Sequence, residues 1–252
     1  MKFFNLNLYK GKCLPAVLAY IKKERFDIIH LQEVSGPGVS FNQWDCFAEI
    51  IRETALQGEI LTSWTKKQDP AGYFSNATFY SSRVKLKEQI NLSFAPFQEI
   101  EDPENLNAAV HPKNALFLRF GIGEKEFWTI NTHMAWGPTP FDEPYKVDNA
   151  RVLAAQLSLL EHPFILSGDF NVVTTTEVMR LVAAHGTNLT EQHGISNTLN
   201  ARLHKAQHLF PPGLAVDFII VHEKIKTDNF KVVQEEDLSD HLGLTVEFSI
   251  LA

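Results

Sequence analysis

The sequence is poor in cysteine, has no long apolar run and carries no excess of positive charge. Its 252 residues include two cysteines, Cys13 and Cys46. Two are too few for a disulfide framework or a cysteine-rich zinc module, and we expect both to be buried thiols. The 23 basic residues are outnumbered by 30 acidic ones, which gives a net charge of −7. That balance disfavours a surface built throughout to hold duplex nucleic acid, although it is compatible with a local basic groove.

Membrane-spanning and targeting segments are also lacking. The sequence contains no stretch of about 18 apolar residues, the length that a membrane span needs. The apolar run at the start of the chain is too short for a signal peptide and has no small-residue cleavage site. We therefore expect no membrane span and a cytoplasmic location.

The sequence also lacks repeats and interdomain linkers. No segment rich in Gly, Ser or Pro divides the chain. Hydrophobic residues make up 44% of the sequence, which is enough for a large core and too many for a disordered or fibrous protein. We expect a single domain over residues 1–252.

Apolar periodicity predicts a mixture of strands and helices. Residues 3–8 and 27–32 have the composition of buried strands, and the apolar residues between them repeat at helical spacing, so this unit has the length of a βαβ motif. Further strands are expected at 73–80, 84–92, 115–120, 127–132, 164–167, 215–222, 230–234 and 243–250. Further helices are expected at 41–56, 147–160 and 175–185, the last capped by Thr174 or Thr175. This mixed order favours one α/β domain with two sheets.

Three stretches are expected to be loops near a site. The segments 93–114 and 136–146 contain prolines and are predicted to be ordered loops. The segment 62–72 carries Lys66 and Lys67 between a predicted helix and a predicted strand, where it would reach a substrate.

Polar residues stand where the predicted strands leave the core. They are Asn7, Glu33, His133, Asp169, Asn171, Asp217, Asp240 and His241. Strand ends that gather on one edge of a sheet make a cleft there, so these side chains are candidates for a common site.

Each candidate also has a purely structural explanation. Gly168-Asp-Phe-Asn171 is common turn chemistry, Glu33 fits a surface position beyond a strand, and an isolated His133 fits a structural histidine. Asp217 is harder to explain in this way, because it lies in an apolar run and an unpaired buried carboxylate is costly. It needs a partner, and His241 is a good candidate.

Taken together, six segments resemble the endonuclease/exonuclease/phosphatase superfamily, whose fold is that of DNase I. They are Leu6-Asn7, Leu31-Gln-Glu33, Asn131-Thr-His133, Gly168-Asp-Phe-Asn171, Asp217-Phe-Ile219 and Ser239-Asp-His241. They occur in the family's order and cover nearly the entire chain. The resemblance implies a four-layer α/β/β/α sandwich with two mixed β-sheets, and a single catalytic domain of a metal-dependent phosphoric ester hydrolase.

The resemblance also implies metal and water-activating residues. Glu33 looks like the metal ligand, with Asn7 beside it and Asp240 completing the shell. Mg²⁺ suits this set of oxygen donors, and Mn²⁺ is the alternative ion. Asp169 resembles the residue that orients or deprotonates the attacking water, and Asn171 resembles a donor to the phosphate.

Further residues are expected to face the phosphate or the substrate. His133 and His241 look like phosphate-facing histidines, with Asp217 holding the ring of His241 in one tautomer. Which histidine protonates the leaving group is left open. Lys113, in the segment where family members often carry Arg or Lys, and Asn76 are expected to bind the substrate.

Two departures from the family pattern limit these expectations. Arg151 and Gln156 are five residues apart, where family members often have Arg and Gln three apart, so we expect that helix to be offset. The segment Asn131-Thr-His133 differs from the Tyr-containing one of members that cut abasic DNA, which argues against that activity.

Other histidines and aromatic residues carry weaker signals. His204 and His208 are four apart, a spacing that can bind zinc on a helix, but no Glu follows the first of them, so a surface or site-rim segment is preferred. His30, within an apolar strand, is expected to be structural. Four loop aromatics would stack on a base, cover a lipid tail or plug the core; they are Phe94, Phe97, Trp136 and Phe141.

The leading hypothesis is a Mg²⁺-dependent phosphoesterase that cleaves phosphodiester bonds by attack of an activated water. A nucleic-acid substrate is favoured by analogy with the family alone. The alternatives are a phosphatase or phosphodiesterase acting on a small phosphoester, such as an inositol phosphate or a phospholipid, and a non-catalytic binding module on the same fold. We expect a monomer.

Overall fold

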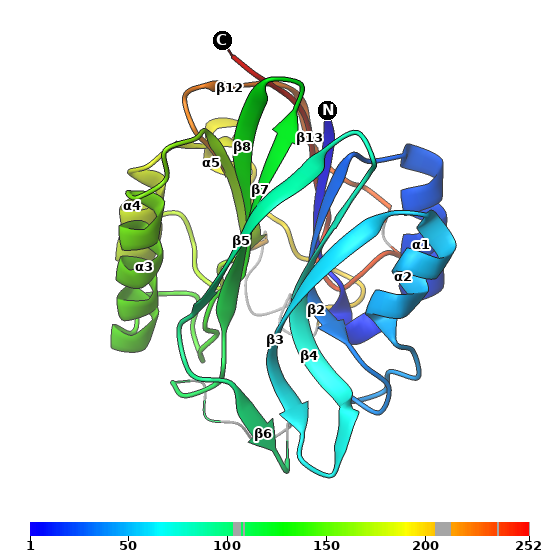
Figure 1. Ribbon diagram of the computed structural model, residues 1–252. Helices are drawn as coiled ribbons and strands as arrows, with labels where there is room; N and C mark the ends of the chain where they lie inside the picture. Colours follow the sequence, from blue (N-terminus) through cyan, green and yellow to red (C-terminus); the bar gives the residue numbers. More distant parts are fainter. Residues whose placement is uncertain (103–106, 108, 205–212, 236, 252) are drawn as a thin grey trace.

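The computed structural model describes residues 1–102, 107, 109–204, 213–235 and 237–251. Two β-sheets lie face to face, with α1 (Leu14–Glu24) and α2 (Cys46–Thr54) outside one sheet and α3 (Pro144–Leu157) and α4 (Glu177–Ala183) outside the other (Figure 1). Two shorter helical segments are η1 (Tyr9–Gly11) and α5 (Leu189–Gln192). The predicted four-layer α/β/β/α sandwich is therefore confirmed.

Both sheets contain parallel and antiparallel pairs. The first consists of β1 (Lys2–Asn7), β2 (Ile28–Ser35), β3 (Gln57–Lys66), β4 (Asp69–Tyr80), β6 (Gln98–Ile100), β12 (Ile225–Val232) and β13 (Leu244–Ile250), in the order β12-β13-β1-β2-β4-β3-β6. The second consists of β5 (Lys85–Ser93), β7 (Asn114–Ile122), β8 (Lys125–His133), β9 (Phe164–Asp169), β10 (Thr187–Asn188) and β11 (Asp217–Val221), in the order β10-β11-β9-β8-β7-β5.

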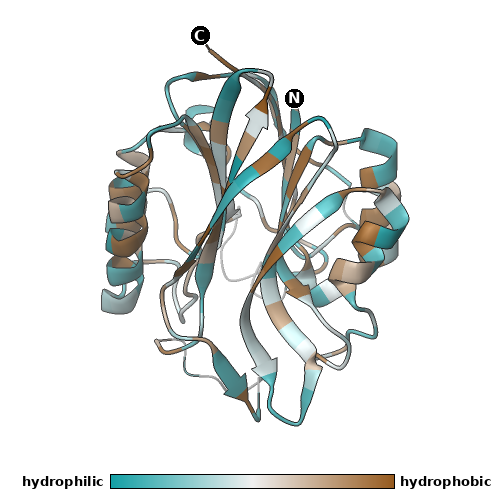
Figure 2. Cartoon of the chain, in the orientation of Figure 1, coloured by the Kyte–Doolittle hydropathy of each residue, from teal (hydrophilic) through white to brown (hydrophobic). Residues whose placement is uncertain are grey.

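The central strands are apolar along most of their length because both of their faces are buried. In β1, Phe3 packs in the core between the two sheets, whereas its neighbour Phe4 packs in the core beneath α1 and α2. Side chains alternate between the faces of a strand, so a strand covered on both sides needs apolar residues at both parities. Helix α3 buries Leu153 and Leu157 against the second sheet, and Figure 2 shows brown and teal bands alternating along this helix.

The layer between the sheets changes from apolar to polar towards one end. In β1 the residues facing this layer run Phe3, Asn5, Asn7, a spacing of two that keeps one strand face. In β9 the corresponding residues are Ser167 and Asp169. Both form hydrogen bonds with β1, since Ser167 donates to Asn5 and Asp169 accepts from Asn7. The two strands thus carry their polar residues to the same end of the sandwich.

Hydrogen bonds join the sheets across this polar part. Gln32 Nε2 donates to Asn5 Oδ1 (3.0 Å) and to Asn131 Oδ1 (2.7 Å), and Ser167 Oγ donates to Asn5 Oδ1 (2.9 Å). His30 Nδ1 lies 2.8 Å from Ser167 Oγ, and its ring is fully buried, in agreement with the structural role expected for it. Buried hydrogen bonds of this kind favour one relative position of the parts they join, although Asn5 Nδ2, Gln32 Oε1 and His30 Nε2 make no hydrogen bond to the described residues.

Two predicted segments are wrong. The expected loop at 62–72 is a hairpin of β3 and β4, in which Lys67 Nζ donates to Glu101 Oε1 (2.7 Å) at the turn. The expected helix at 41–56 begins only at Cys46, because the Asp45 carboxylate accepts from Ala48 N (3.0 Å) as an N-cap. The apolar residues before this cap are exposed rather than part of a helical face.

Other boundaries shift by a few residues. Helix α3 begins three residues before the expected 147, and α4 is capped by Thr176 rather than Thr174 or Thr175. Cys46 is buried as expected, but Cys13 is only half-buried; both are free thiols. No helix in the described part of the chain is long and apolar enough to cross a membrane.

Candidate active site

A cavity of about 330 Å³ opens at the polar end of the layer between the sheets. Eight of the ten predicted site residues line it, namely Asn7, Glu33, Lys113, His133, Asp169, Asn171, Asp240 and His241. We call this space the active-site cavity. Residues from β1 to the segment before β13 meet here, so the convergence expected from the sequence is present.

The strand register explains why distant residues meet. β8 and β9 are parallel, and His133 and Asp169 are paired at their ends. Asp217 pairs with Asp169 from the other side. Asp217, which the sequence places within a strand at 215–222, is the first residue of β11 and not at its carboxyl end; β11 runs antiparallel to β9, so its first residue reaches the same edge.

Glu33 reaches the cavity through a β-bulge and not at a strand end. β2 continues to Ser35, and its register with β4 shifts between Leu31 and Val34. Glu33 itself has a φ of 55°. A bulge inserts an extra residue, bends the strand and re-aims a side chain, which is how Glu33 comes to line the cavity while its neighbours stay in the ladder.

The segment Gly168-Asp-Phe-Asn171 forms the turn expected from its composition, and two of its residues, Asp169 and Asn171, line the active-site cavity. A Cβ at Gly168 would lie 1.8 Å from Thr132 O, so only glycine lets β9 approach β8 this closely. Asn171 N donates to Asp169 Oδ1 (2.9 Å), which is turn chemistry that also fixes the carboxylate. The turn therefore holds Asp169 at the cavity wall.

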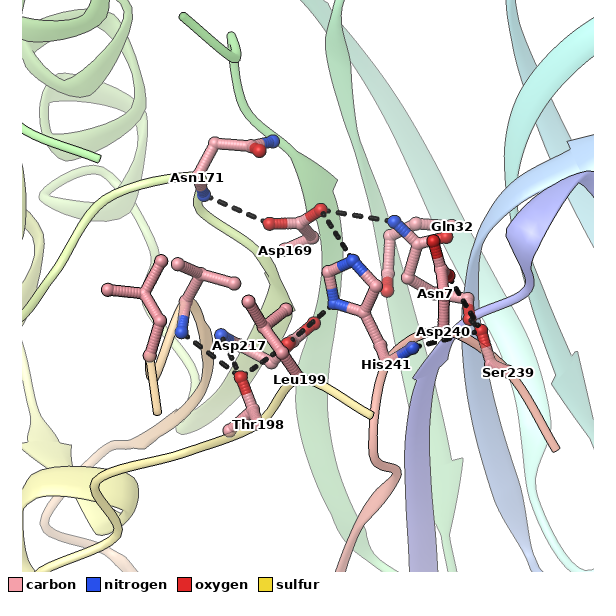
Figure 3. Close-up of polar contacts among 12 residues, drawn as sticks. Asn7, Gln32, Asp169, Asn171, Thr198, Leu199, Asp217, Ser239, Asp240 and His241 are labelled. Carbon is pink, nitrogen blue, oxygen red and sulfur yellow. Dashed lines mark hydrogen bonds and ion pairs between the residues drawn. The ribbon is translucent and has the colours of Figure 1, made fainter. Parts of the chain in front are cut away.

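A buried chain of hydrogen bonds leads from Thr198 through Asp217 to His241 (Figure 3). Thr198 Oγ1 donates to Asp217 Oδ2 (2.6 Å), and His241 Nδ1 lies 2.8 Å from the same oxygen. The expected pairing of Asp217 with His241 is present. Burial by itself lowers the pKa of His241, but Asp217, Asp169 and Asp240 together raise it well above its usual value. These acidic neighbours therefore favour the protonated form of His241.

Asp169 is the most constrained carboxylate of the cavity. Its Oδ2 accepts from Asn7 Nδ2 (3.0 Å) and lies 3.5 Å from His133 Nε2 and 3.9 Å from His241 Nε2. Burial raises the pKa of Asp169, while the charge of His241 opposes that shift. The carboxylate is thus held by donors and is more basic than an exposed aspartate.

Lys113 and His133 form a second buried pair. Lys113 Nζ lies 2.8 Å from His133 Nε2. Burial, and then the charge of Lys113, lower the pKa of His133 well below its usual value. Burial lowers the pKa of Lys113 to about 8, against the effect of Glu33 and Asp169. His133 is therefore neutral and accepts a hydrogen bond from the lysine ammonium.

The acidic side of the cavity fits a divalent ion. Burial, opposed by His241 and supported by Glu33, raises the pKa of Asp240 to about 7. Asn7 Oδ1 accepts from Tyr9 N (3.1 Å) and keeps its other lone pair. Carboxylate and amide oxygens are the donors that Mg²⁺ and Mn²⁺ prefer, and few protein ligands are needed because Mg²⁺ retains water.

Two tighter groups of possible ligand atoms occur among the described residues, each within 4.8 Å. They are His204, Asp240 and His241, and Asp169, Asp217 and His241. The second group is accounted for by the bond from His241 to Asp217. Glu33 belongs to neither group. The predicted metal ligands Glu33, Asn7 and Asp240 therefore line the same cavity but do not form one close cluster of ligand atoms.

The structure does not bring Asn76 to the cavity. This residue is buried in β4, and its Nδ2 donates to Asn114 Oδ1 (2.8 Å) and Asn114 O (3.0 Å). Of the four loop aromatics, Trp136 lines the cavity and the other three do not.

His204 lines the cavity, which confirms the site-rim prediction for it; His208 lies outside the described residues. Burial lowers the pKa of His204 to about 4.

Sequence reasoning missed several residues that shape the site. Lys10, Ser40, Trp64, Phe74 and His111 also line the cavity. Thr198 and Lys146 act through hydrogen bonds to Asp217 and to the Asn171 carbonyl. No motif in the sequence singles these residues out; Thr198, for example, stands between Asn197 and Leu199.

The family model of the endonuclease/exonuclease/phosphatase family matches residues 4–241. A search of curated proteins gives no match. Similar solved structures include the Bacteroides thetaiotaomicron VPI-5482 mannosyl-6-phosphatase Bt3783, with 16% identity, a TM-score of 0.71 and coverage of 99% of this chain and 100% of that one.

Two other similar structures come from animals. The human Nocturnin catalytic domain with bound sulfate is 19% identical, with a TM-score of 0.73 and coverage of 99% and 94% of the two chains. D. rerio TDP2 complexed with single strand DNA product is 16% identical, with a TM-score of 0.69 and coverage of 99% and 98%. At these identities the likeness shows a shared fold and leaves the substrate open.

Proposed function

Since the chain belongs to the endonuclease/exonuclease/phosphatase family and is a phosphoester hydrolase, we propose that it works with Mg²⁺ and that a water held at Asp169 attacks the phosphorus. The observation that supports this most is the environment of Asp169. Its two oxygens are fixed by Asn171 N and Asn7 Nδ2, at the wall of a cavity that is also lined by His241 and Lys113. The presence of this complete set argues against a non-catalytic binding module.

Asp169 is suited to accept a proton from water. A general base works best when its pKa is raised towards the working pH, and burial raises that of Asp169. Its hydrogen bonds leave it little freedom to rotate, so the water it holds has a defined direction of attack.

Cationic and amide groups are placed to stabilise the phosphoryl oxygens. His241, kept charged by Asp217, and Lys113, held at His133, both line the cavity. Asn171 Nδ2 donates to Met134 O (3.1 Å) and retains a second N–H for the phosphate. Preformed donors in a buried site contribute strongly to the stability of a charged transition state.

Glu33, with Asn7 and Asp240, would hold the Mg²⁺ ion. When bound, the ion neutralises charge on the phosphoryl oxygens and lowers the cost of water attack. Protonation of the leaving oxygen is assigned to His241, because its acidic neighbours raise its pKa, whereas burial and Lys113 lower that of His133.

The test is a panel of phosphate monoesters and diesters assayed with Mg²⁺, Mn²⁺ and EDTA. Asp169→Asn should lower kcat by about 10²–10⁴-fold with little change in KM, because the acid–base step is lost and the cavity is kept. Asp228→Asn, an exposed position on β12, is the matched control. Wild-type turnover in Asp169→Asn, or turnover unaffected by EDTA, would overturn the proposal.

A further inference from the structure

A second hollow of about 350 Å³ opens directly beside the active-site cavity. We call it the side pocket. One wall is the segment 136–140, and the other is formed by Leu199, Leu214 and Val216. The two spaces share four lining residues, which are Trp136, Asn171, His204 and His241. A group bound in the side pocket is therefore separated from the proposed phosphoryl position only by these shared side chains.

The wall formed by 136–140 is tied down on both sides. Lys146, which is 1% exposed, donates from Nζ to Thr139 O (2.8 Å) and to Asn171 O (3.1 Å). Tyr145 Oη donates to Trp136 O (3.1 Å), and Val173 N donates to Pro140 O (3.0 Å). The pocket wall is thus preformed, and a ligand does not have to order it on binding.

The chemistry of the side pocket differs from that of the active-site cavity. Among its lining residues that the structure describes, none is Asp, Glu, Lys or Arg. The walls present the Trp136 ring, two prolines and three aliphatic side chains. Trp136 is 43% exposed, a large apolar surface to leave in water next to a reaction centre.

Such a lining selects for an uncharged group with a flat or aliphatic surface. Pockets for small ligands are mostly apolar with a few polar groups at one end, and here those polar groups are the residues shared with the active-site cavity. A polynucleotide strand would instead need cations along its path to neutralise successive phosphates. Apart from His241, which also lines the active-site cavity, the described lining residues of the side pocket supply none.

We propose that the side pocket binds the organic group of the substrate, and that this group is a small, uncharged, ring-bearing alcohol esterified to the phosphate. The inference rests on the proposed function and narrows its substrate class. It places the phosphate among Asp169, His241 and Lys113, and the ring against Trp136 and Leu214. It favours a small phosphoester over a nucleic acid as the substrate.

The kinetic test compares benzyl phosphate with methyl phosphate, whose leaving alcohols are similar in acidity. Burial of a ring is worth about 1.5–3 kcal/mol, so kcat/KM for the benzyl ester should exceed that for the methyl ester by roughly 10-fold or more. Leu214→Asp puts a charge in the pocket and should bring the ratio close to one. Leu159→Asp, at a side chain that is 71% exposed and lines neither space, is the matched control and should keep the wild-type ratio.

A binding measurement separates failure of this inference from failure of the proposed function. Calorimetry with benzylphosphonate and methylphosphonate, which are not hydrolysed, should give tighter binding of the benzyl compound to the wild type and no preference in Leu214→Asp. If this preference appears without hydrolysis of any ester, the pocket stands and the proposed function fails. Equal binding of both phosphonates, an unchanged ratio in Leu214→Asp, or preferred turnover of single-stranded DNA with a KM that rises steeply with salt would overturn the inference.

Discussion

Buried charges in this protein are each matched to a specific partner. Asp217 is 1% exposed, accepts from Thr198 and pairs with His241. Asp169 takes donors from Asn7 and Asn171. Since an unpartnered buried carboxylate is strongly unfavourable, these contacts are what allow charged groups to be concentrated at one end of a hydrophobic sandwich.

The burial of His30 should make the unfolding free energy depend on pH. Burial lowers the pKa of His30 from 6.5 to about 3, so the folded protein keeps this ring neutral while the unfolded chain takes up a proton below pH 6.5. The stability that depends on neutral His30 is therefore present above the unfolded pKa and is lost as the pH falls towards the folded one. Relative to His30→Gln, the wild type should lose about 2 kcal/mol of unfolding free energy between pH 7 and pH 5, measured by urea unfolding. A difference that does not change with pH would contradict this.

One site residue could be predicted from its surroundings alone: Asp217 stands out because a carboxylate within an apolar run needs a partner. Glu33 and the other site residues were predicted through the resemblance of their motifs to the family. Lys146 and Lys10 could not be found in this way, since a lysine on a helix or after a strand is normally a surface residue. Their roles depend on which backbone carbonyl or cavity lies nearby, and a single sequence does not contain that information.

At the level of secondary structure, segments of irregular backbone position several of the site residues. The bulge in β2 aims Glu33 into the cavity, and the turn after β9 gives Asn171 a φ of 54°. The helix α3 supplies Lys146, which joins the turn at Asn171 to the segment that walls the side pocket.

Lys146→Met tests the role of this connection. It removes two charge-assisted hydrogen bonds and leaves the carbonyls of Thr139 and Asn171 without that donor, which should cost about 1–3 kcal/mol of unfolding free energy. kcat should fall as well, because the Asn171 turn is no longer held. Lys146→Arg keeps donors and should recover part of both losses. An unchanged kcat in Lys146→Met, with the stability lowered, would show that the lysine acts on stability alone.

Element prediction succeeded where burial imposes a pattern and failed where it does not. β1 and β9 are covered on both faces and were recognised as apolar runs. The sequence does not predict β3, because seven of its ten residues are only half-buried and no clear period marks it. The helix at 41–56 was drawn too long because Phe41 and Trp44 happen to fit helical spacing, although both are exposed and Asp45 starts the helix after them.

On the scale of the whole molecule, the gradient from apolar to polar between the sheets defines where the reaction takes place. Tyr80, Leu116 and Phe120 belong to the dry core between the sheets, and Gln32 and Asn131 join the sheets nearer the cavity. The resemblance of six short motifs to the family implied this architecture, and each motif lies on a different strand or at its edge. The substrate could not be predicted in the same way, since the walls of both cavities come from loops and bulges.

The most direct test of the roles proposed for Glu33 and Asp169 is to measure Mg²⁺-dependent stability and activity in the same variants. In the wild type, Mg²⁺ at 100 times its dissociation constant should stabilise the fold by about 2.7 kcal/mol and restore turnover after EDTA treatment. Glu33→Ala should lose both effects, whereas Asp169→Asn should keep the Mg²⁺-dependent rise in Tm and lose turnover. Mg²⁺-dependent turnover at the wild-type level in Glu33→Ala would contradict the assignment of the metal site, and so would a Tm that does not respond to Mg²⁺ in the wild type.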